Sequence, residues 1–140
     1  MARIIKVNHI GIASGADSSA LDFFSSGLGL PDGGSEWVPQ DKVKVRFLPI
    51  GESRIELLEP VGEEGPIQKH LQTRGPGIHH LCLEVDDLPG MLEHLKQRGV
   101  RLIDSEPRLG AHGTLVAFIH PKSTGGILIE LVQAQQKNLI

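Results

Sequence analysis

The sequence has a single cysteine, and this scarcity excludes two kinds of protein. Cys82 lies within the apolar run 81–85, so a disulfide framework and a cysteine zinc site are both excluded. Chains that use so little cysteine are typical of a reducing compartment, and we therefore expect a cytoplasmic protein.

Positive charge and long apolar runs are also scarce. Lysine and arginine total 14 against 17 for aspartate and glutamate, and no stretch concentrates positive charge, which disfavours nucleic acid or an anionic membrane as a partner. No segment reaches the roughly 18 apolar residues of a membrane helix, and the first residues do not read as a signal peptide. We expect neither a membrane anchor nor a secretion signal, and one domain over residues 1–140.

The sequence contains an internal repeat. The segment 8–12 recurs at 79–83, which places His9 on His80, and the same offset places Phe47 on Phe118. After a longer loop in the second half, Glu56 falls on Glu130. Two halves, about 4–60 and 76–133, therefore share one plan.

Each half reads as β-α-β-β-β. The apolar patterns predict first-half strands at 4–13, 36–38, 43–48 and 53–58, and second-half strands at 78–85, 100–104, 113–120 and 126–132. They also predict a helix at about 17–29 and a second helix that Asp86 and Asp87 can cap and that Gly99 ends. Pairing two such modules predicts an α+β fold, with an eight-stranded mixed sheet and helices on its outer face.

The repeat singles out two histidines and two glutamates that interrupt equivalent strands, namely His9, Glu56, His80 and Glu130. A glutamate between apolar neighbours on a strand faces either solvent or a cavity. Two buried carboxylates with two imidazoles need a cation to neutralise them. The set suits one divalent first-row metal ion per chain, such as Co, Ni, Mn or Zn.

Other histidines lie near this set. His79 and His80 are adjacent on one strand and face opposite ways, so the match to His9 selects His80 as the ligand. We interpret His79 as a surface group or as a support for a ligand, and expect substitution of His80, not of His79, to weaken metal binding. His70 lies on a predicted helical stretch, and we expect it to be exposed to solvent.

The chemistry of such a site is that of a Lewis acid. A cation with vacant coordination positions acts on a carbonyl or enolate oxygen, which predicts enolate chemistry. No Ser-His-Asp order and no glycine-rich nucleotide loop is present, so nucleophilic catalysis and phosphate binding are not supported.

The sequence resembles the vicinal oxygen chelate (glyoxalase/bleomycin resistance) superfamily and, within it, a family of acyl-CoA epimerases. The resemblance covers nearly the whole chain and rests on the paired modules, the four ligand positions and the segments 54–60, 77–80, 84–87, 106–113, 120–126 and 128–131. It implies a sheet that curls around a metal site, a homodimer, and metal-dependent interconversion of (2R)- and (2S)-methylmalonyl-CoA through an enolate.

The resemblance also implies roles for individual residues. His9, Glu56, His80 and Glu130 would hold the metal, and Glu130 would be the catalytic base. A carboxylate bound to a cation is a weakened base, so Glu130 would have to bind through one oxygen or swing free. The loop residues Lys122 and Ser123 would receive the carboxylate or the CoA of the substrate.

One position departs from the family pattern. Some members carry a second glutamate on the strand that matches 43–48, as the other acid/base. Here that position falls on Val45, or on Lys44 after a shift of one residue, and neither is a carboxylate. A symmetric mechanism with two glutamates is therefore in question.

Two other functions remain open at this point. A glyoxalase I type isomerase uses a similar ligand set on a glutathione hemithioacetal, but the segments 106–113 and 120–126 argue against it. A metal-free protein that sequesters an antibiotic is disfavoured by the complete set of ligand-type residues.

Overall fold

The computed structural model describes residues 1–15 and 17–134. Its strands are β1 (Ile4–Ala13), β2 (Ser35–Val38), β3 (Val43–Ile50), β4 (Ser53–Pro60), β5 (Gly77–Val85), β6 (Arg108–Leu109), β7 (Leu115–Ile119) and β8 (Ile129–Gln133). Its helices are α1 (Ser19–Leu21), which continues as the π-helical segment Asp22–Gly27, then α2 (Pro66–Arg74) and α3 (Leu88–Gln97).

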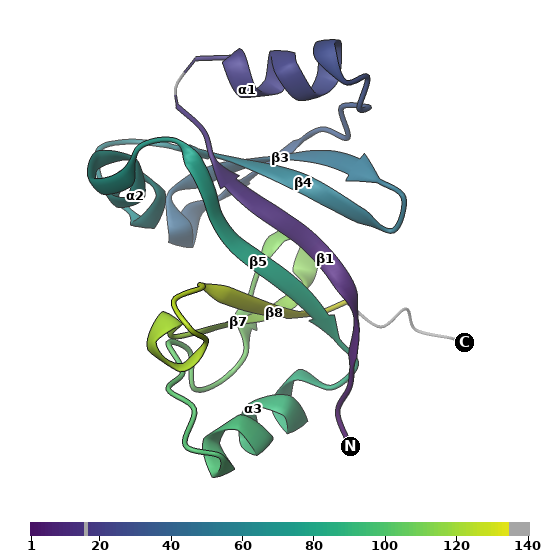
Figure 1. Cartoon of the computed structure of the whole chain (residues 1–140), viewed down its shortest axis with the longest axis vertical. Helices are drawn as coiled ribbons and strands as arrows, with labels where there is room; N and C mark the ends of the chain where they lie inside the picture. The colour runs from purple at the N-terminus through teal and green to yellow at the C-terminus, as the bar shows by residue number, and fades with distance from the viewer. Residues whose placement is uncertain (16, 135–140) are drawn as a thin grey trace. The chain divides into compact units, whose positions relative to one another are not determined.

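The strands are hydrogen-bonded in the order β2-β3-β4-β1-β5-β8-β7-β6 (Figure 1). β1 is parallel to β4 and β5 is parallel to β8, whereas β2 and β3, β3 and β4, β6 and β7, and β7 and β8 are antiparallel. The two β-α-β-β-β modules therefore have the same pairing scheme. This confirms the predicted α+β fold with an eight-stranded mixed sheet.

The chain forms two compact units. The first-half unit consists of residues 9–80, and the second-half unit consists of residues 1–8 with the chain from Leu81 onward. Both β1 and β5 run from one unit into the other, so the units do not coincide with the two sequence repeats. The assignment of residues 1–140 to one domain stays a prediction.

Strand register confirms the alignment of the two halves. In the first-half unit Glu56 pairs with Gly11 of β1 and with Phe47 of β3. In the second-half unit Glu130 pairs in the same way with Cys82 of β5 and Phe118 of β7. The hairpin loop after β7 is longer than the loop after β3, as the sequence repeat predicted.

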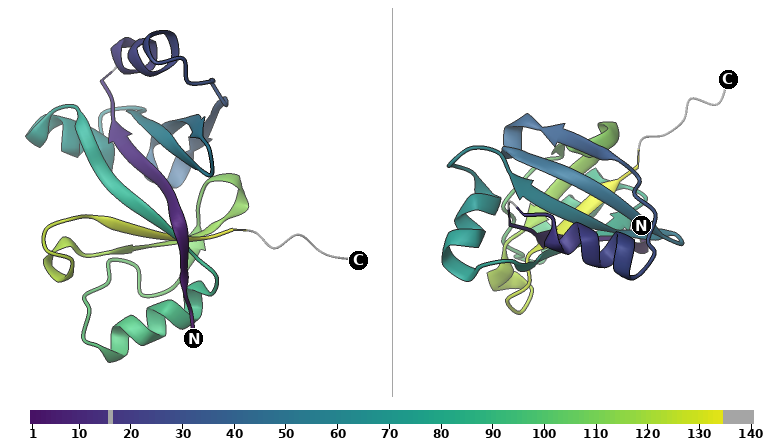
Figure 2. Two further views of the ribbon diagram at one scale, coloured as in Figure 1. Left: turned by 45° about the vertical axis from the view of Figure 1, so that its right-hand side comes forward. Right: turned by 90° about the horizontal axis from the view of Figure 1, so that it is seen from above.

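The core of the second-half unit lies between α3 and the sheet. Leu88 and Leu92 of α3 are fully buried, together with Ala117 of β7 and Leu131 of β8. The Asp87 side chain caps α3 by accepting a hydrogen bond from the Gly90 N–H at 3.1 Å, as predicted. In the left-hand view of Figure 2, α3 lies beside β7 and β8.

Residues 100–104 do not form the predicted strand. Only Leu102 makes a ladder contact, an isolated bridge to Ile119. The Asp104 carboxylate accepts the hydrogen bond of the Phe118 N–H at 2.9 Å, in place of the backbone carbonyl that a regular ladder would use. The strand that pairs with β7 is instead β6, Arg108–Leu109.

In the part of the chain that the structure describes, no helix combines the length and the apolar character needed to span a membrane.

Candidate metal centre

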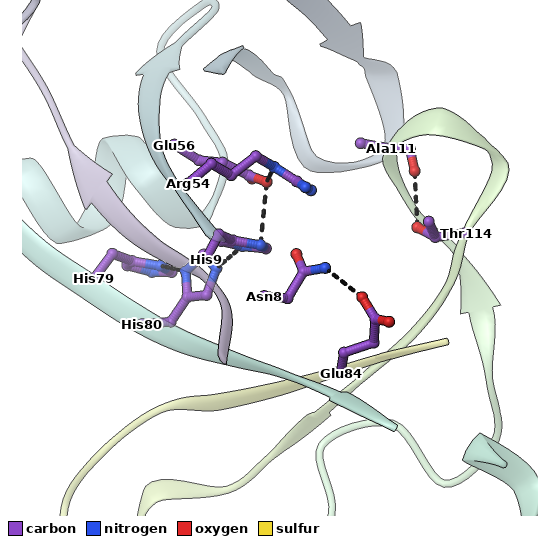
Figure 3. Close-up of polar contacts among 9 residues, drawn as sticks. All are labelled: Asn8, His9, Arg54, Glu56, His79, His80, Glu84, Ala111 and Thr114. Atoms are coloured by element: carbon purple, nitrogen blue, oxygen red, sulfur yellow. Dashed lines mark hydrogen bonds and ion pairs between the residues drawn. The ribbon is translucent and has the colours of Figure 1, made fainter. Parts of the chain in front are cut away.

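Two buried imidazoles face each other in the first-half unit. His9 on β1 and His80 on β5 are each 5% exposed. Their Nε2 atoms lie 3.0 Å apart and their rings are almost perpendicular, at 85° (Figure 3). The structure therefore brings together the pair that the sequence repeat selected.

Glu56 is the third member of the cluster. Its Oε2 atom lies 3.1 Å from Nδ1 of His9 and accepts a hydrogen bond from Nε of Arg54 at 2.8 Å. The contact is on the Nδ1 side of His9, away from His80, so in this conformation Glu56 fixes the tautomer of His9. Its role as a direct metal ligand stays a prediction.

A glycine makes room for His80. A Cβ atom built on Gly11 would lie 2.2 Å from Cε1 and 2.5 Å from Nδ1 of the His80 ring, which is closer than atoms can approach. Gly11 is next to Glu56 in the parallel pairing of β1 with β4. The absence of a side chain here is thus a condition for the position of the imidazole.

A divalent cation fits the donor set of the first-half unit. At a metal–nitrogen distance of about 2.1 Å, two neighbouring ligands of an octahedral ion are about 3.0 Å apart, which matches the separation of the two Nε2 atoms. Because a carboxylate only accepts, a neutral His9 carries its proton on Nδ1 and has a lone pair on Nε2. The two Nε2 atoms are thus the donors that this conformation offers to a cation, and imidazole nitrogen is a ligand that first-row divalent ions prefer.

Glu130 lies in the second-half unit, at the position that matches Glu56. It is 9% exposed, and in the sheet it is opposite Cys82 of β5 on one side and Phe118 of β7 on the other. Strand alternation places its side chain on the face opposite to α3, because the neighbouring Leu131 packs against that helix. Three of the four predicted ligands are thus in one unit and the fourth is in the other.

The register of β3 also shows which of Val45 and Lys44 lies on the face of Glu56. Val45 is on the face of Glu56, because Phe47, two residues further on, pairs with Glu56. Lys44 pairs with Glu59 on the opposite face, where it lines a cavity with residues that include Ser18 of the α1 region. The alternative that placed Lys44 at the site is therefore wrong.

Sequence reasoning missed a carboxylate on the neighbouring strand. Glu36 of β2 pairs directly with Val45, and paired residues of antiparallel strands project from the same face. The half-buried Glu36 is thus on the face of Val45, Phe47 and Glu56. The signal was available only from the β2–β3 register, because the sequence does not show which residues of two strands are opposite each other.

Arg54 adds a cation beside Glu56. Its guanidinium lies over the ring of Phe47, 5.4 Å from the ring centre, and its side chain is 28% exposed. This arrangement combines an ion pair with a cation–π contact, and Arg54 and His9 together hold the Oε2 atom of Glu56 in place.

The loop after β7 carries the two predicted substrate-binding residues. Lys122 is exposed, whereas the hydroxyl oxygen of Ser123 accepts a hydrogen bond from the backbone N–H of Arg101 at 2.8 Å. His120 accepts one from the Lys122 N–H at 3.1 Å, and its pKa is lowered by partial burial and then by Arg101 and Lys122. Near neutral pH the positive charges here are therefore Lys122 of the loop and Arg101, which contacts the loop through Ser123.

Two further histidines adjoin the cluster. Nδ1 of His79 lies 2.9 Å from Nδ1 of His80, and the ring of His70 on α2 packs edge-on against the ring of His79, with centroids 5.1 Å apart. His70 is half-buried, so the expectation that it is exposed to solvent was wrong. Burial, followed by the charge of Arg74, lowers the pKa of His70.

Known proteins resemble the chain over most of its length. Residues 8–118 match the model of the Glyoxalase/Bleomycin resistance protein/Dioxygenase superfamily. The mitochondrial methylmalonyl-CoA epimerase of Homo sapiens is 38% identical over 130 residues, which are 92% of this chain and 74% of that protein. The ethylmalonyl-CoA/methylmalonyl-CoA epimerase of Cereibacter sphaeroides is 39% identical over 91% of this chain and 97% of its own length.

A solved structure shows the same similarity. A variant of the methylmalonyl-CoA epimerase of Streptomyces coelicolor, in complex with 2-nitronate-propionyl-CoA, superposes with a TM-score of 0.90 and 30% identity, over 96% of this chain and 100% of that one. The similarity thus extends over nearly the full length of both chains.

Proposed function

Because the chain belongs to the glyoxalase/bleomycin resistance protein/dioxygenase superfamily and matches acyl-CoA epimerases over most of its length, we propose that it interconverts (2R)- and (2S)-methylmalonyl-CoA. The observation that carries this proposal is the buried cluster of His9, His80 and Glu56, built to hold a divalent cation beside a carboxylate-bearing face. The acyl-CoA thioester is the small-molecule partner.

The metal ligands in this proposal are His9, Glu56, His80 and Glu130, and the ion is Co, Ni, Mn or Zn. When bound, such a cation acts as a Lewis acid that lowers the free energy of an enolate. The contribution of this chain is to bury the ligands, to orient His9 through Glu56 and to leave space for His80 at Gly11.

The reaction moves one proton and changes no other bond. A carboxylate removes the proton alpha to the thioester, the electron pair of the C–H bond passes into the enolate, and a proton returns to the opposite face of the same carbon. Glu130 is the proposed base. Glu36, which the β2–β3 register places on the face of Glu56, is the proposed acid/base for the other face of the substrate.

The charged end groups of the substrate need cationic partners. Lys122 is exposed and Ser123 is in the same turn, so this loop is the proposed contact for the substrate carboxylate or for CoA. The hydroxyl of Ser123 already accepts a bond from Arg101, which leaves its own proton to donate.

The test is turnover in deuterated water with the metal identified. The purified protein is expected to contain about one divalent ion per chain and to interconvert the two enantiomers of methylmalonyl-CoA, with deuterium entering only at the alpha carbon. A chelator is expected to abolish the exchange and added metal to restore it. Turnover of a glutathione hemithioacetal instead, or a metal-free protein that binds but does not exchange, would contradict the proposal.

We also propose a cytoplasmic homodimer. The superfamily resemblance motivates the dimer, together with the position of β2 and β6 at the two edges of the sheet. Light scattering at micromolar concentration is expected to give twice the mass of one chain. A mass near 15.2 kDa would contradict the dimer.

A further inference from the structure

The candidate metal centre continues into a line of hydrogen-bonded imidazoles. Glu56 contacts Nδ1 of His9, the Nε2 atoms of His9 and His80 face each other at 3.0 Å, and the Nδ1 atoms of His80 and His79 face each other at 2.9 Å (Figure 3). All four residues belong to the first-half unit. The direction of each hydrogen bond in this line follows from the carboxylate at one end.

Without a cation, the line has one consistent arrangement of neutral imidazoles. Glu56 only accepts, so His9 donates from Nδ1 and accepts at Nε2. His80 then donates from Nε2 and accepts at Nδ1, where His79 donates from its own Nδ1. Each of the three contacts has one donor and one acceptor, and no buried nitrogen is left without a partner.

A cation between His9 and His80 requires a different arrangement. Metal coordination uses a lone pair on Nε2, and His9 already offers one because its proton faces Glu56. His80 offers one only if its proton moves to Nδ1, which faces His79. The hydrogen bond between the two neighbouring histidines then has to run in the opposite direction.

We infer that His79 is the positioning residue for His80, and that its imidazole changes from hydrogen-bond donor to acceptor when a cation binds between His9 and His80. In this exchange His80 moves its proton from Nε2 to Nδ1, and His79 moves its proton from Nδ1 to Nε2. Each imidazole keeps one proton, so the three rings together neither gain nor release one. The inference rests on the proposed metal-dependent function.

The surroundings of His79 suit this role. His79 is half-buried, so its Nε2–H reaches water or another acceptor in the cation-bound form. The edge of His70 packs against the ring at 78° and limits its rotation. Burial and Arg74 lower the pKa of His70, so this neighbour is neutral at neutral pH and adds no positive charge beside the line.

Removing the partner has a defined cost. With His79 replaced by leucine, the buried Nδ1–H of a coordinating His80 would lose the acceptor that His79 supplies, which is unfavourable. Loss of such an outer partner typically weakens metal binding by about 10- to 100-fold. Asparagine is the matched control, because its amide both donates and accepts and places these atoms near the position of Nδ1.

The experiment combines zinc titration with nitrogen NMR of the histidine rings. In the wild-type protein, His80 is expected to be the Nε2–H tautomer without Zn²⁺ and the Nδ1–H tautomer with Zn²⁺. His79→Leu is expected to weaken Zn²⁺ binding by about 10- to 100-fold, and His79→Asn to restore it to within about threefold. Circular dichroism verifies that both variants are folded.

Each outcome bears on the inference. Equal Zn²⁺ affinity in the wild type and in His79→Leu, or an unchanged His80 tautomer on zinc binding, would overturn it while leaving the proposed function in place. A wild-type protein that binds neither Zn²⁺ nor any other divalent ion would overturn the proposed metal site and this inference together. Weaker Zn²⁺ binding in His79→Leu would contradict the expectation from the sequence that substitution of His79 leaves metal binding unchanged.

Discussion

Replacing Glu130 with glutamine is expected to lower the rate of methylmalonyl-CoA interconversion by at least about 10²-fold, the usual effect of losing a general base. Glutamine keeps the shape of the side chain, but its amide is not a base that can accept the alpha proton. Glu130 is 9% exposed and pairs with Phe118 across β7 and β8, so the variant also keeps the packing of the strand. The measurement is deuterium incorporation into the thioester, with the metal content verified.

Glu56→Gln is the matched control, because Glu56 occupies the equivalent position of the other repeat. The amide oxygen of the glutamine still accepts hydrogen bonds from Arg54 and His9, so activity is expected to survive largely once metal is supplied. If Glu130→Gln with a full metal site exchanges deuterium at the wild-type rate, the proton is handled by another group.

Glu36→Gln separates the two faces of the substrate. With each enantiomer assayed alone, the variant is expected to retain alpha-proton exchange in one enantiomer and to lose inversion, because only one carboxylate then remains. Equal loss of exchange in both enantiomers would show that Glu36 does not act as the second acid/base.

The second large effect is expected from a single methyl group. Gly11→Ala places a Cβ 2.2 Å from Cε1 and 2.8 Å from Nε2 of His80, so the imidazole has to leave its position. Metal affinity is expected to fall by at least tenfold, since the ring also loses its contacts with His9 and His79. Isothermal titration with Co²⁺ or Ni²⁺ measures the loss.

Gly15→Ala is the control for this variant. A Cβ at Gly15 meets no atom within 4 Å, and its backbone does not adopt the left-handed conformation that favours glycine. Its metal affinity is expected to match that of the wild type. If Gly11→Ala binds metal as tightly as Gly15→Ala, then His80 is not a ligand in the described position.

Much of the fold could be predicted because the sequence contains an internal repeat. The role of a residue such as Glu56 is ambiguous when the residue is considered alone, but its match to Glu130 predicted equivalent strands in both halves and a longer loop in the second. The equivalent pairings of Glu56 with Phe47 and of Glu130 with Phe118 confirm this prediction. The cap of α3 could be narrowed to Asp86 or Asp87, because an N-cap depends on neighbouring residues only, and the structure shows that Asp87 is the cap.

The errors concern contacts between segments that are distant in sequence. The segment 100–104 has the composition of a strand, but Asp104 competes for the N–H of Phe118 through its side chain. The place of Glu36 depends on which residue of β3 it pairs with. The role of His79 depends on ring orientations, which strand alternation alone does not give.

The assignment of the first part of β1 to the second-half unit has a consequence for synthesis on the ribosome. Residues 1–8 belong to the second-half unit, where Arg3 and Asp86 are joined by two hydrogen bonds. The N–H of Arg3 donates to Oδ1 of Asp86 at 2.8 Å, and the N–H of Asp86 donates to the carbonyl oxygen of Arg3 at 3.1 Å. During synthesis, residues 1–8 therefore leave the exit tunnel long before Asp86, with which Arg3 pairs. Neither repeat encodes a complete unit: in a chain interrupted between the repeats, residues 9–13 of β1 could still pair with β4, but residues 1–8 would lack the unit to which they belong. Such non-local closure predicts slow folding and a nascent chain that depends on holding factors to avoid aggregation.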